Sequence, residues 1–430
     1  MTKALERVST SAQIPDATSV VIIGGGIVGV SAALTLAERN IPVVLLEKGE
    51  IACEQSSRNL GWIRKTSRHL EDVPMALAAD KLWQSMPERI GRSVGYQQSG
   101  IMFLADNEEQ LAVHDKWLQS VSSLNLDSRL LSRREVDERV PGSAKEWAGA
   151  IFTGSDGRAE PAIATSAMAN AAQRKGAQLI QHCAVRTLST SGGKVSGVVT
   201  EFGEIKCDQV ILAGGAWSRR FLGNMGVSLP TLPLICTVLR TSPVDGPTEI
   251  AVGASNFSFR KHYKGGYIIT QRGALKAPLT LDHLLLGMKY LDQLKTQRSF
   301  LRLSLGKSFI DDLRLPRRWQ ATGLSPFEKK RVNDPPTVTE LNQEAMENLC
   351  AAWPVFKQAA VEEAWAGLID VTPDSNPVID TISALPGLTL ATGFSGHGFG
   401  TGPAAGQLAA DIATGEAPLI DPMPYRFSRL

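Results

Sequence analysis

Residues 20–47 read VVIIGGGIVGVSAALTLAERNIPVVLLE, and this stretch decides the fold. The apolar run Val20–Ile23 predicts a buried strand, and Val43–Leu46 predicts a second one. Between them, Ser31–Arg39 consists mostly of helix-forming residues. A glycine-rich turn joins the first strand to this helix. The segment therefore has the strand, turn, helix, strand order of a dinucleotide-binding unit.

Three glycines in the turn have the spacing G-x-G-x-x-G, at Gly24, Gly26 and Gly29. The first permits a tight turn, the second lets backbone N–H groups approach a pyrophosphate, and the third lets the helix pack closely on the strand. The helix N-terminus presents its partial positive charge to the phosphates. Glu47 follows the second strand, where such folds place an acid on the adenosine ribose hydroxyls. The motif predicts a bound dinucleotide.

The same region raises the alternative of a membrane span, because Ser19–Ala37 contains no charged residue. A spanning helix with four glycines in its first half would lose about 1 kcal/mol per glycine relative to alanine. The strand, turn and helix arrangement uses all four glycines and is favoured. Residues 1–18 lack an apolar segment, so no secretory signal is expected.

Length and composition indicate two packed domains in a reducing compartment. The 430 residues are 43% hydrophobic, and 45 basic against 43 acidic residues leave a net charge of +2. This balance gives no reason to expect a nucleic-acid partner. The cysteines have no C-x-x-C spacing, so neither a disulfide framework nor a metal site is expected, and we expect a cytoplasmic protein. The five, each expected to be a small buried residue, are Cys53, Cys183, Cys207, Cys236 and Cys350.

The segment that follows Glu47 indicates which dinucleotide is bound. Residues 48–69 read KGEIACEQSSRNLGWIRKTSRH, a polar stretch where a nicotinamide-binding domain would continue with another helix and strand. Here the chain resembles the D-amino-acid oxidase superfamily of flavoproteins, which includes glycine oxidase, sarcosine oxidase and D-amino-acid dehydrogenases. In that superfamily an acidic and a basic residue after the second strand precede a serine-rich loop that wraps FAD. The matching residues are Glu47, Lys48, Ser56, Ser57 and Arg58.

Two later segments carry the same resemblance. Residues 208–218 read DQVILAGGAWS, and residues 388–406 read LTLATGFSGHGFGTGPAAG, which is similar to the family's final strand, flavin-contacting loop and closing helix. The N-terminus of a helix over about 404–413 would stabilise negative charge on the reduced ring. The resemblance implies non-covalent FAD. The implied contacts are Gly214, Gly215 and Trp217 in the first segment, and Gly393, Gly396, His397, Gly398, Phe399, Gly400 and Thr401 in the second.

The order of these motifs predicts an α/β fold, α+β overall, with two domains. A discontinuous Rossmann-type FAD-binding domain is expected from residues 18–91, 155–225 and 364–420. A second, mostly antiparallel β-sheet domain for the substrate is expected from residues 92–154 and 226–363. This division places the substrate cavity over the flavin ring.

Smaller features are also predicted. Asn256–Thr270 should form a hairpin whose turn contains Gly265 and Gly266, and Val185 should offer its backbone to adenine. Leucines at helical spacing predict an amphipathic helix over Thr280–Gln297, within a basic insertion at about 280–318. This insertion either packs on the body or docks on a membrane, an electron acceptor or a second subunit, which would place the protein peripherally on the inner membrane face.

The resemblance implies oxidation of a carbon–nitrogen bond in a small amino acid. A hydride would pass from Cα to flavin N5, the resulting imine would be hydrolysed by water, and oxygen or another electron acceptor would reoxidise the flavin. The favoured substrate is a secondary amine, such as an N-carboxyalkyl glycine, an imino diacid like iminodiacetate, or an opine. Two alternatives stay open: a D-amino-acid or D-hydroxyproline dehydrogenase, and the flavin subunit of a heteromeric dehydrogenase.

The residue that binds the substrate carboxylate must differ from those of the relatives. Glycine oxidases place an arginine after a W-x-G-L motif, where this chain has Ile369, and sarcosine oxidases place a lysine after H-G-F, where it has Gly400. A cation is nevertheless required, and arginine binds a carboxylate best. The pocket candidates are Arg64, Lys65 and His69 after the serine-rich loop, Arg260 and Tyr267 on the hairpin, and His397, with Arg64, Lys65 and Arg260 as the candidate anchors.

Overall fold

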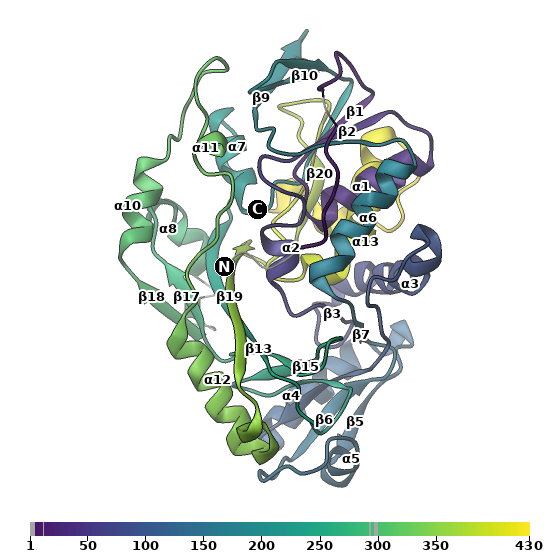
Figure 1. Cartoon of the computed structure of the whole chain (residues 1–430), viewed down its shortest axis with the longest axis vertical. Coiled ribbons are helices and arrows are strands. Elements are labelled where there is room, and N and C mark those ends of the chain that lie inside the picture. Colours follow the sequence, from purple (N-terminus) through teal and green to yellow (C-terminus); the bar gives the residue numbers. More distant parts are fainter. Residues whose placement is uncertain (1–4, 12, 292–293, 296–299) are drawn as a thin grey trace.

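The computed structural model describes residues 5–11, 13–291, 294–295 and 300–430 (Figure 1). The sheet in the upper half of Figure 1 consists of β1 (Val20–Ile23), β2 (Val43–Leu46), β8 (Gln178–Ile180), β12 (Gln209–Leu212), β20 (Val378–Thr381) and β21 (Leu388–Thr392). Its strand order is β20-β21-β12-β1-β2-β8, and every neighbouring pair is parallel except β20 with β21. The predicted strands Val20–Ile23 and Val43–Leu46 are confirmed.

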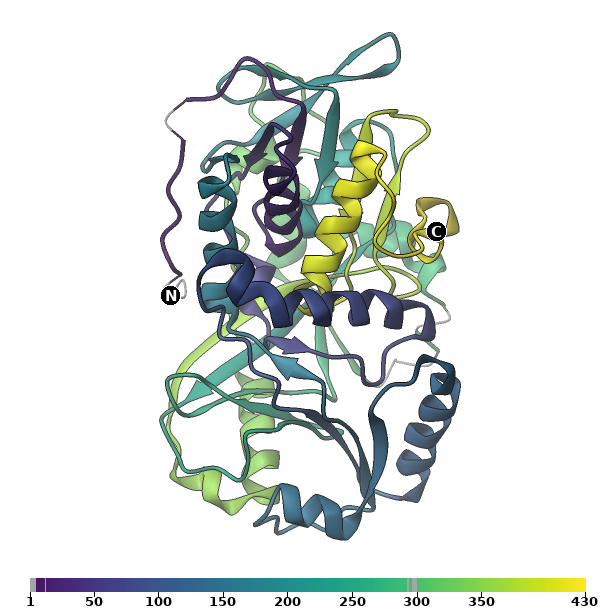
Figure 2. The same ribbon diagram turned by 90° about the vertical axis from the view of Figure 1, so that its right-hand side faces the viewer.

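Helices from distant parts of the chain pack together on one face of this upper sheet (Figure 2). They are α1 (Ile27–Glu38), α3 (Val73–Ile90), α6 (Pro161–Arg174) and α13 (Gly398–Thr414). Helices α1 and α13 approach closely, since a Cβ on Gly406 would lie 2.5 Å from Ser31 Cβ. The sheet and these helices bury one apolar core that includes Ile22, Leu34 and Leu408. The predicted helix over 404–413 is confirmed and begins earlier, at Gly398.

The opposite face of the upper sheet carries a small antiparallel sheet and one short helix. They are β9 (Val185–Ser191), β10 (Lys194–Thr200), β11 (Glu204–Lys206) and α7 (Ser218–Asn224). Val21 packs here with Val198 and Leu222. Because successive strand residues face opposite sides, β1 contributes to both cores.

The second large sheet, in the lower half of Figure 1, is mostly antiparallel, as predicted. Its strands are β4 (Ile101–Ala105), β5 (Ser128–Ser132), β6 (Gly149–Thr153), β13 (Leu232–Thr241), β14 (Ala251–Gly253), β15 (Ser258–Lys261), β16 (Tyr267–Thr270), β17 (Leu275–Pro278), β18 (Leu301–Ser304) and β19 (Val361–Val371). Only β14 with β4 and β17 with β18 pair in parallel. Strand β19 runs through residue 364 and pairs with β13 on both sides of it, so no strand end marks the expected domain boundary there. The division into two domains stays a prediction.

Shorter elements complete the described chain. They are α2 (Gln55–Arg58), the paired strands β3 (Trp62–Ile63) and β7 (Gly157–Arg158), and the helices α4 (Glu108–Ser120), α5 (Arg133–Arg139), α8 (Leu281–Leu286), α10 (Lys307–Arg314), α11 (Pro326–Lys329) and α12 (Thr339–Ala352). Strands β15 and β16 form the predicted hairpin. Its turn requires glycine, since Gly265 and Gly266 have φ values of +82° and +69°.

The prediction of one helix over Thr280–Gln297 is confirmed in part. Helix α8 ends at Leu286, a 3₁₀ turn, Gly287–Tyr290, follows it, and residues 291 and 294–295 are again helical. At the 3₁₀ turn, the Tyr290 hydroxyl lies 2.9 Å from the Pro230 carbonyl oxygen and 2.6 Å from that of Val371. These contacts hold the turn against the body of the protein. The rest of the predicted helix includes positions 292–293 and 296–297, which lie outside the described residues.

Residues 19–37, considered above as a membrane span, instead form β1, the glycine turn and most of α1. Within the described residues, no helix combines the length and the apolar character needed to cross a membrane.

Candidate functional site

A cavity of about 430 Å³ is lined by residues from both large sheets. The carboxyl ends of β1, β2 and β12 contribute Gly24, Glu47 and Gly214. Parallel strands converge at this edge, which is where open α/β sheets bind nucleotides. The lower sheet contributes Phe103 and Thr270 to the same cavity. We call the region around Gly24, Glu47 and Gly214 the nucleotide part of the cavity, and the region around Phe103 and Thr270 the substrate part.

The glycines of the turn have the separate roles that their spacing predicts. Gly24 has φ +113°, and a Cβ there would lie 2.4 Å from the Ala213 carbonyl oxygen. A Cβ on Gly29 would lie 2.1 Å from the Gly24 oxygen, so Gly29 serves close packing and does not line the cavity. A Cβ on Gly26 would meet only Ser56 Oγ, at 3.1 Å, and Gly26 lines the cavity. The turn leaves open backbone where a pyrophosphate must approach.

Glu47 lies in the nucleotide part and is held by two backbone bonds. Its Oε2 accepts from Gly25 N and its Oε1 from Gly49 N, both at 2.7 Å. Burial raises the pKa of the Glu47 carboxyl above its ordinary value. Ser56 Oγ accepts from Ile27 N at 2.8 Å, at the first turn of α1. These residues fit a dinucleotide, because each carboxylate oxygen keeps acceptor capacity toward the cavity.

Most of the other residues expected to contact the cofactor also line the cavity. They are Lys48, Arg58, Val185, Gly215, Trp217, Gly396, His397, Gly398, Phe399 and Gly400. Three further ones lie behind its walls: Ser57 and Thr401 are buried, and Gly393 donates its N–H to Asp370 Oδ2 at 2.9 Å. Thr401 Oγ1 donates to the His397 carbonyl oxygen at 3.0 Å. These three residues support the loop and do not face the cavity.

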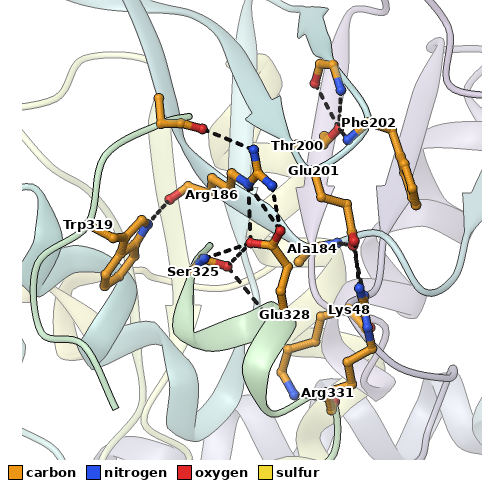
Figure 3. A network of polar contacts seen from close by, with 12 residues as sticks. Lys48, Ala184, Arg186, Thr200, Glu201, Phe202, Trp319, Ser325, Glu328 and Arg331 are labelled. Atoms are coloured by element: carbon orange, nitrogen blue, oxygen red, sulfur yellow. Dashed lines mark hydrogen bonds and ion pairs between the residues drawn. The ribbon is translucent and has the colours of Figure 1, made fainter. Parts of the chain in front are cut away.

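Two ion pairs hold a segment after the insertion, residues 326–331, against the small antiparallel sheet, and we call it the closing segment (Figure 3). Glu328 Oε1 accepts from Arg186 Nη2 at 2.6 Å, which joins α11 to β9. Arg331 Nη2 donates to Glu201 Oε2 at 2.6 Å, just beyond β10. Phe327, next to Glu328, lines the cavity. These contacts were not predicted from the sequence, because the partners are more than 100 positions apart.

The substrate part contains two guanidinium groups beside one aromatic ring. The Arg272 guanidinium carbon lies 3.9 Å from the centroid of Phe103, and that of Arg64 lies 5.6 Å from it. Arg64 Nη2 lies 3.4 Å from His397 Nε2. Burial, with smaller effects of Arg68 and Arg272, lowers the pKa of Arg64 to about 9, and burial lowers that of Arg272 to about 10. Both side chains line the cavity.

The cavity's other cations are already neutralised. Lys48 Nζ lies 2.7 Å from Glu54 Oε1, Arg58 Nη1 lies 2.9 Å from an Asp334 oxygen, and Arg68 Nη1 lies 2.7 Å from Asp72 Oδ2. Within the described part of the chain, neither Arg64 nor Arg272 has a carboxylate oxygen within 4 Å. Among the described residues, these two cavity cations therefore have no carboxylate at ion-pair distance, and Asp156 and Asp72 act on Arg64 only from farther away.

Comparison with known proteins gives the identity of the cofactor. Residues 19–412 match the profile of the FAD dependent oxidoreductase family. The chain belongs to this family. It is therefore an FAD-dependent oxidoreductase, and the resemblance to the D-amino-acid oxidase superfamily is confirmed. FAD is a dinucleotide, which agrees with the prediction from the glycine turn.

Relatives of several kinds share this oxidoreductase fold. The structure of L-amino acid deaminase from Proteus myxofaciens in complex with anthranilate is similar over 100% of this chain and 97% of that one, with 34% identity and a TM-score of 0.96. Glycine oxidase of Pseudomonas aeruginosa is 26% identical, over 94% of this chain and 97% of its own length. The mitochondrial pyruvate dehydrogenase phosphatase regulatory subunit of Mus musculus is 29% identical over 60% of this chain, which covers only 30% of that protein.

The structure of this oxidoreductase corrects two of the three candidate carboxylate anchors. Lys65 Nζ lies 2.7 Å from Asp80 Oδ2 and 3.3 Å from Asp156 Oδ1. Arg260 forms a buried bidentate pair with Glu160. Neither side chain lines the cavity. Because each charge is already compensated inside the protein, we withdraw Lys65 and Arg260 and keep Arg64.

Two other pocket candidates also lie outside the cavity lining. His69 is exposed, and the Tyr267 hydroxyl donates to the Thr248 carbonyl oxygen at 3.1 Å. Residues alternate along a strand, so Tyr267 faces away from the side of β16 that holds Thr270. Arg272 does line the cavity. It lies beyond the end of β16, and Gln271 beside it also lines the cavity, so strand alternation in the sequence does not single out Arg272.

His397 keeps its predicted place, in the cavity just before α13. Burial, reinforced by Arg68 and Arg64, holds the pKa of His397 well below its ordinary value. The imidazole is therefore neutral and can accept a hydrogen bond. Asp370 is a second cavity residue that the sequence did not reveal: its Oδ1 accepts from Gln55 Nε2 at 2.7 Å, and burial raises its pKa.

Proposed function

We propose that this oxidoreductase oxidises the carbon–nitrogen bond of a small amino acid whose carboxylate is bound by Arg272. The observation that carries the proposal is an uncompensated guanidinium in the cavity that also contains the FAD-binding turn. Arginine binds a carboxylate through two parallel hydrogen bonds. FAD, when bound, supplies the two-electron oxidation.

The residues around the substrate have distinct roles in this proposal. Arg272 fixes the carboxylate, and the Phe103 ring beside its guanidinium limits the positions that the side chain can adopt. Neutral His397 can accept a hydrogen bond from the substrate amine and so orient it in the cavity. Trp62 and Phe103 pack edge to face, with centroids 5.6 Å apart, and both line the cavity. These rings exclude water from the reacting carbon.

We favour a secondary amine, such as an N-carboxyalkyl glycine, an imino diacid or an opine, as the substrate. D-amino acids and D-hydroxyproline are the alternative from the sequence. The likeness to an L-amino acid deaminase, at 34% identity, adds L-amino acids as a second candidate class. A flavin subunit that acts only in a heteromeric enzyme is a further alternative, and the relation to a regulatory subunit supports it.

We also propose that the insertion contacts the inner membrane surface, where the protein would meet its electron acceptor. Apolar rather than basic side chains support this contact. Leu284, Leu285, Met288, Leu303 and Leu305 are 63–78% exposed. Two of the basic residues are neutralised, Arg302 by Glu344 and Arg317 by Asp282. Two other charged residues of the insertion, Asp292 and Arg298, lie outside the described residues.

Anaerobic flavin reduction tests the proposed reaction. The purified FAD-loaded chain is mixed with a panel of D- and L-amino acids, secondary amino acids and amines without a carboxylate. Bleaching by amino acids, and not by the matching amines, is expected. Reduction by the amines alone would refute the proposal. Bleaching that requires a second polypeptide would favour the heteromeric alternative.

A further inference from the structure

We propose that the substrate carries two anionic groups, the first bound by Arg272 and the second by Arg64. This inference rests on the proposed function, because it names the class of amino acid that the same cavity accepts. Acidic amino acids and imino diacids belong to this class. An amino acid with one carboxylate and a neutral side chain does not.

The first argument is the balance of charge in the substrate part. Three of the five cavity cations have carboxylate partners, as described above, and Arg64 and Arg272 do not. Arg64 is half-buried, Arg272 is exposed, and both line the cavity, so a ligand that fills the cavity would remove water from both charges. A charge without water or a counter-charge is costly, so the ligand should supply that counter-charge. One carboxylate would neutralise Arg272 and leave Arg64 without a partner.

The second argument is that Arg64 is held toward the cavity. Its Nη1 donates to the Thr66 carbonyl oxygen, and its backbone oxygen accepts from Arg68 Nε at 2.7 Å. Its Nη2 lies beside His397 Nε2, at 3.4 Å. These contacts fix the side chain without removing its charge. The remaining N–H groups of the guanidinium are the donors for a ligand.

The third argument is the common position of the two arginines. Both guanidinium groups lie against the Phe103 ring, and each lines the cavity. The positive charge of Arg272 contributes to lowering the pKa of Arg64, so the two groups act on each other. A single small molecule with two carboxylates can reach both groups and relieve this repulsion.

Matched diacids and monoamides test the charge requirement. Glutamate with glutamine, aspartate with asparagine, and iminodiacetate with its monoamide differ mainly in one charge. Wild-type protein should reduce its flavin with a kcat/KM at least about tenfold higher for the diacid, as expected for a hydrogen bond to a charged group. In Arg64→Met this ratio should fall to about one. Arg64→Lys should restore part of the ratio.

Two outcomes would overturn the inference. One is an equal rate for diacid and monoamide in the wild type. The other is an equal loss for both in Arg64→Met, which would mean that Arg64 serves the flavin and not the second carboxylate. Arg134→Met, at an exposed position on α5, is the control for a lost surface arginine.

An inert-ligand titration separates this inference from the proposed function. Malonate, succinate and glutarate, each with its monoamide, are added to the oxidised holoprotein, and binding is followed by the flavin spectrum. Preference for the dicarboxylates that disappears in Arg64→Met supports the second anionic site even if no amino acid reduces the flavin. Equal binding of acid and amide contradicts it even if amino acids are oxidised.

Discussion

Arg260 donates through Nη2 to Glu160 Oε2 at 3.0 Å, and both side chains are only 1% exposed. A second bond joins Arg260 Nη1 to the other carboxylate oxygen, and Arg260 Nε donates to the Leu60 carbonyl oxygen at 2.6 Å. Glu160 precedes α6 beside the upper sheet, whereas Arg260 lies on β15 of the lower sheet. The pair therefore connects the two halves of the molecule.

Arg260→Ala should lower stability and leave substrate specificity unchanged. Loss of Arg260 leaves buried Glu160 with the longer contacts to Arg158, at 3.6 Å, and to His262, so the unfolding free energy should fall by up to about 3–5 kcal/mol. Urea denaturation of the holoprotein measures this loss. The matched control Arg240→Ala removes a more exposed arginine of the neighbouring β13. If the Arg260→Ala variant has the stability of the wild type but a raised KM, the structural role of Arg260 is contradicted.

Gly26→Val should abolish FAD retention while the chain still folds. Gly26 has φ −73°, which valine adopts without strain, and its added side chain would occupy the pyrophosphate approach. Gly29→Ala should instead destabilise the apoprotein, because its Cβ would lie 2.1 Å from the Gly24 oxygen. FAD per chain after gel filtration and apoprotein melting distinguish the two effects. Normal FAD content in Gly26→Val would place the pyrophosphate elsewhere.

Glu47→Gln should weaken FAD binding by about 1.5–3 kcal/mol, or roughly tenfold to a hundredfold in Kd. The carboxylate would accept charge-assisted bonds from the ribose in addition to those from Gly25 and Gly49. Glutamine keeps one acceptor oxygen for the two backbone donors, so the apoprotein should also lose some stability, which apoprotein melting measures separately. FAD affinity is measured by the quenching of flavin fluorescence. An unchanged Kd would remove Glu47 from the ribose site.

The nucleotide part could be predicted from the sequence, and most of the substrate part could not. The spacing of Gly24, Gly26 and Gly29 is local, so a short stretch of chain specifies both the turn and the strands around it. The free or neutralised state of a cation depends on residues far away in the chain. Lys65 is compensated by Asp80, 15 positions away, and by the more distant Asp156, and Arg260 is compensated by Glu160, 100 positions away. These ion pairs cannot be recognised from the sequence pattern alone.

The contribution of Glu328 to FAD retention should disappear in acid. Although burial opposes it, hydrogen bonds from Arg186 and Ser325 lower the pKa of Glu328 from 4.5 to about 2. A carboxyl with a lowered pKa in the folded state stabilises it above the unfolded pKa, and this stabilisation is lost as the pH falls toward the folded pKa. Wild type should therefore retain FAD better than Glu328→Gln above about pH 4.5. The two should converge near pH 2.

The release of FAD from each protein is measured by flavin fluorescence during an acid titration. Glu138→Gln, on exposed α5, controls for the loss of a surface carboxylate. A difference between wild type and Glu328→Gln that stays constant down to pH 2 would show that the ion pair does not hold the closing segment.

Anaerobic single-turnover reduction of FAD-loaded Arg272→Met, with the best amino acid of the substrate panel, tests the central claim most directly. The account predicts that the second-order rate constant for flavin reduction falls at least about a hundredfold, because the substrate carboxylate loses its cationic partner in the cavity. Bound FAD and unfolding free energy should stay near wild type, and Arg272→Lys should recover part of the rate. Reduction of Arg272→Met by the same amino acid at the wild-type rate would contradict the claim that Arg272 anchors the substrate.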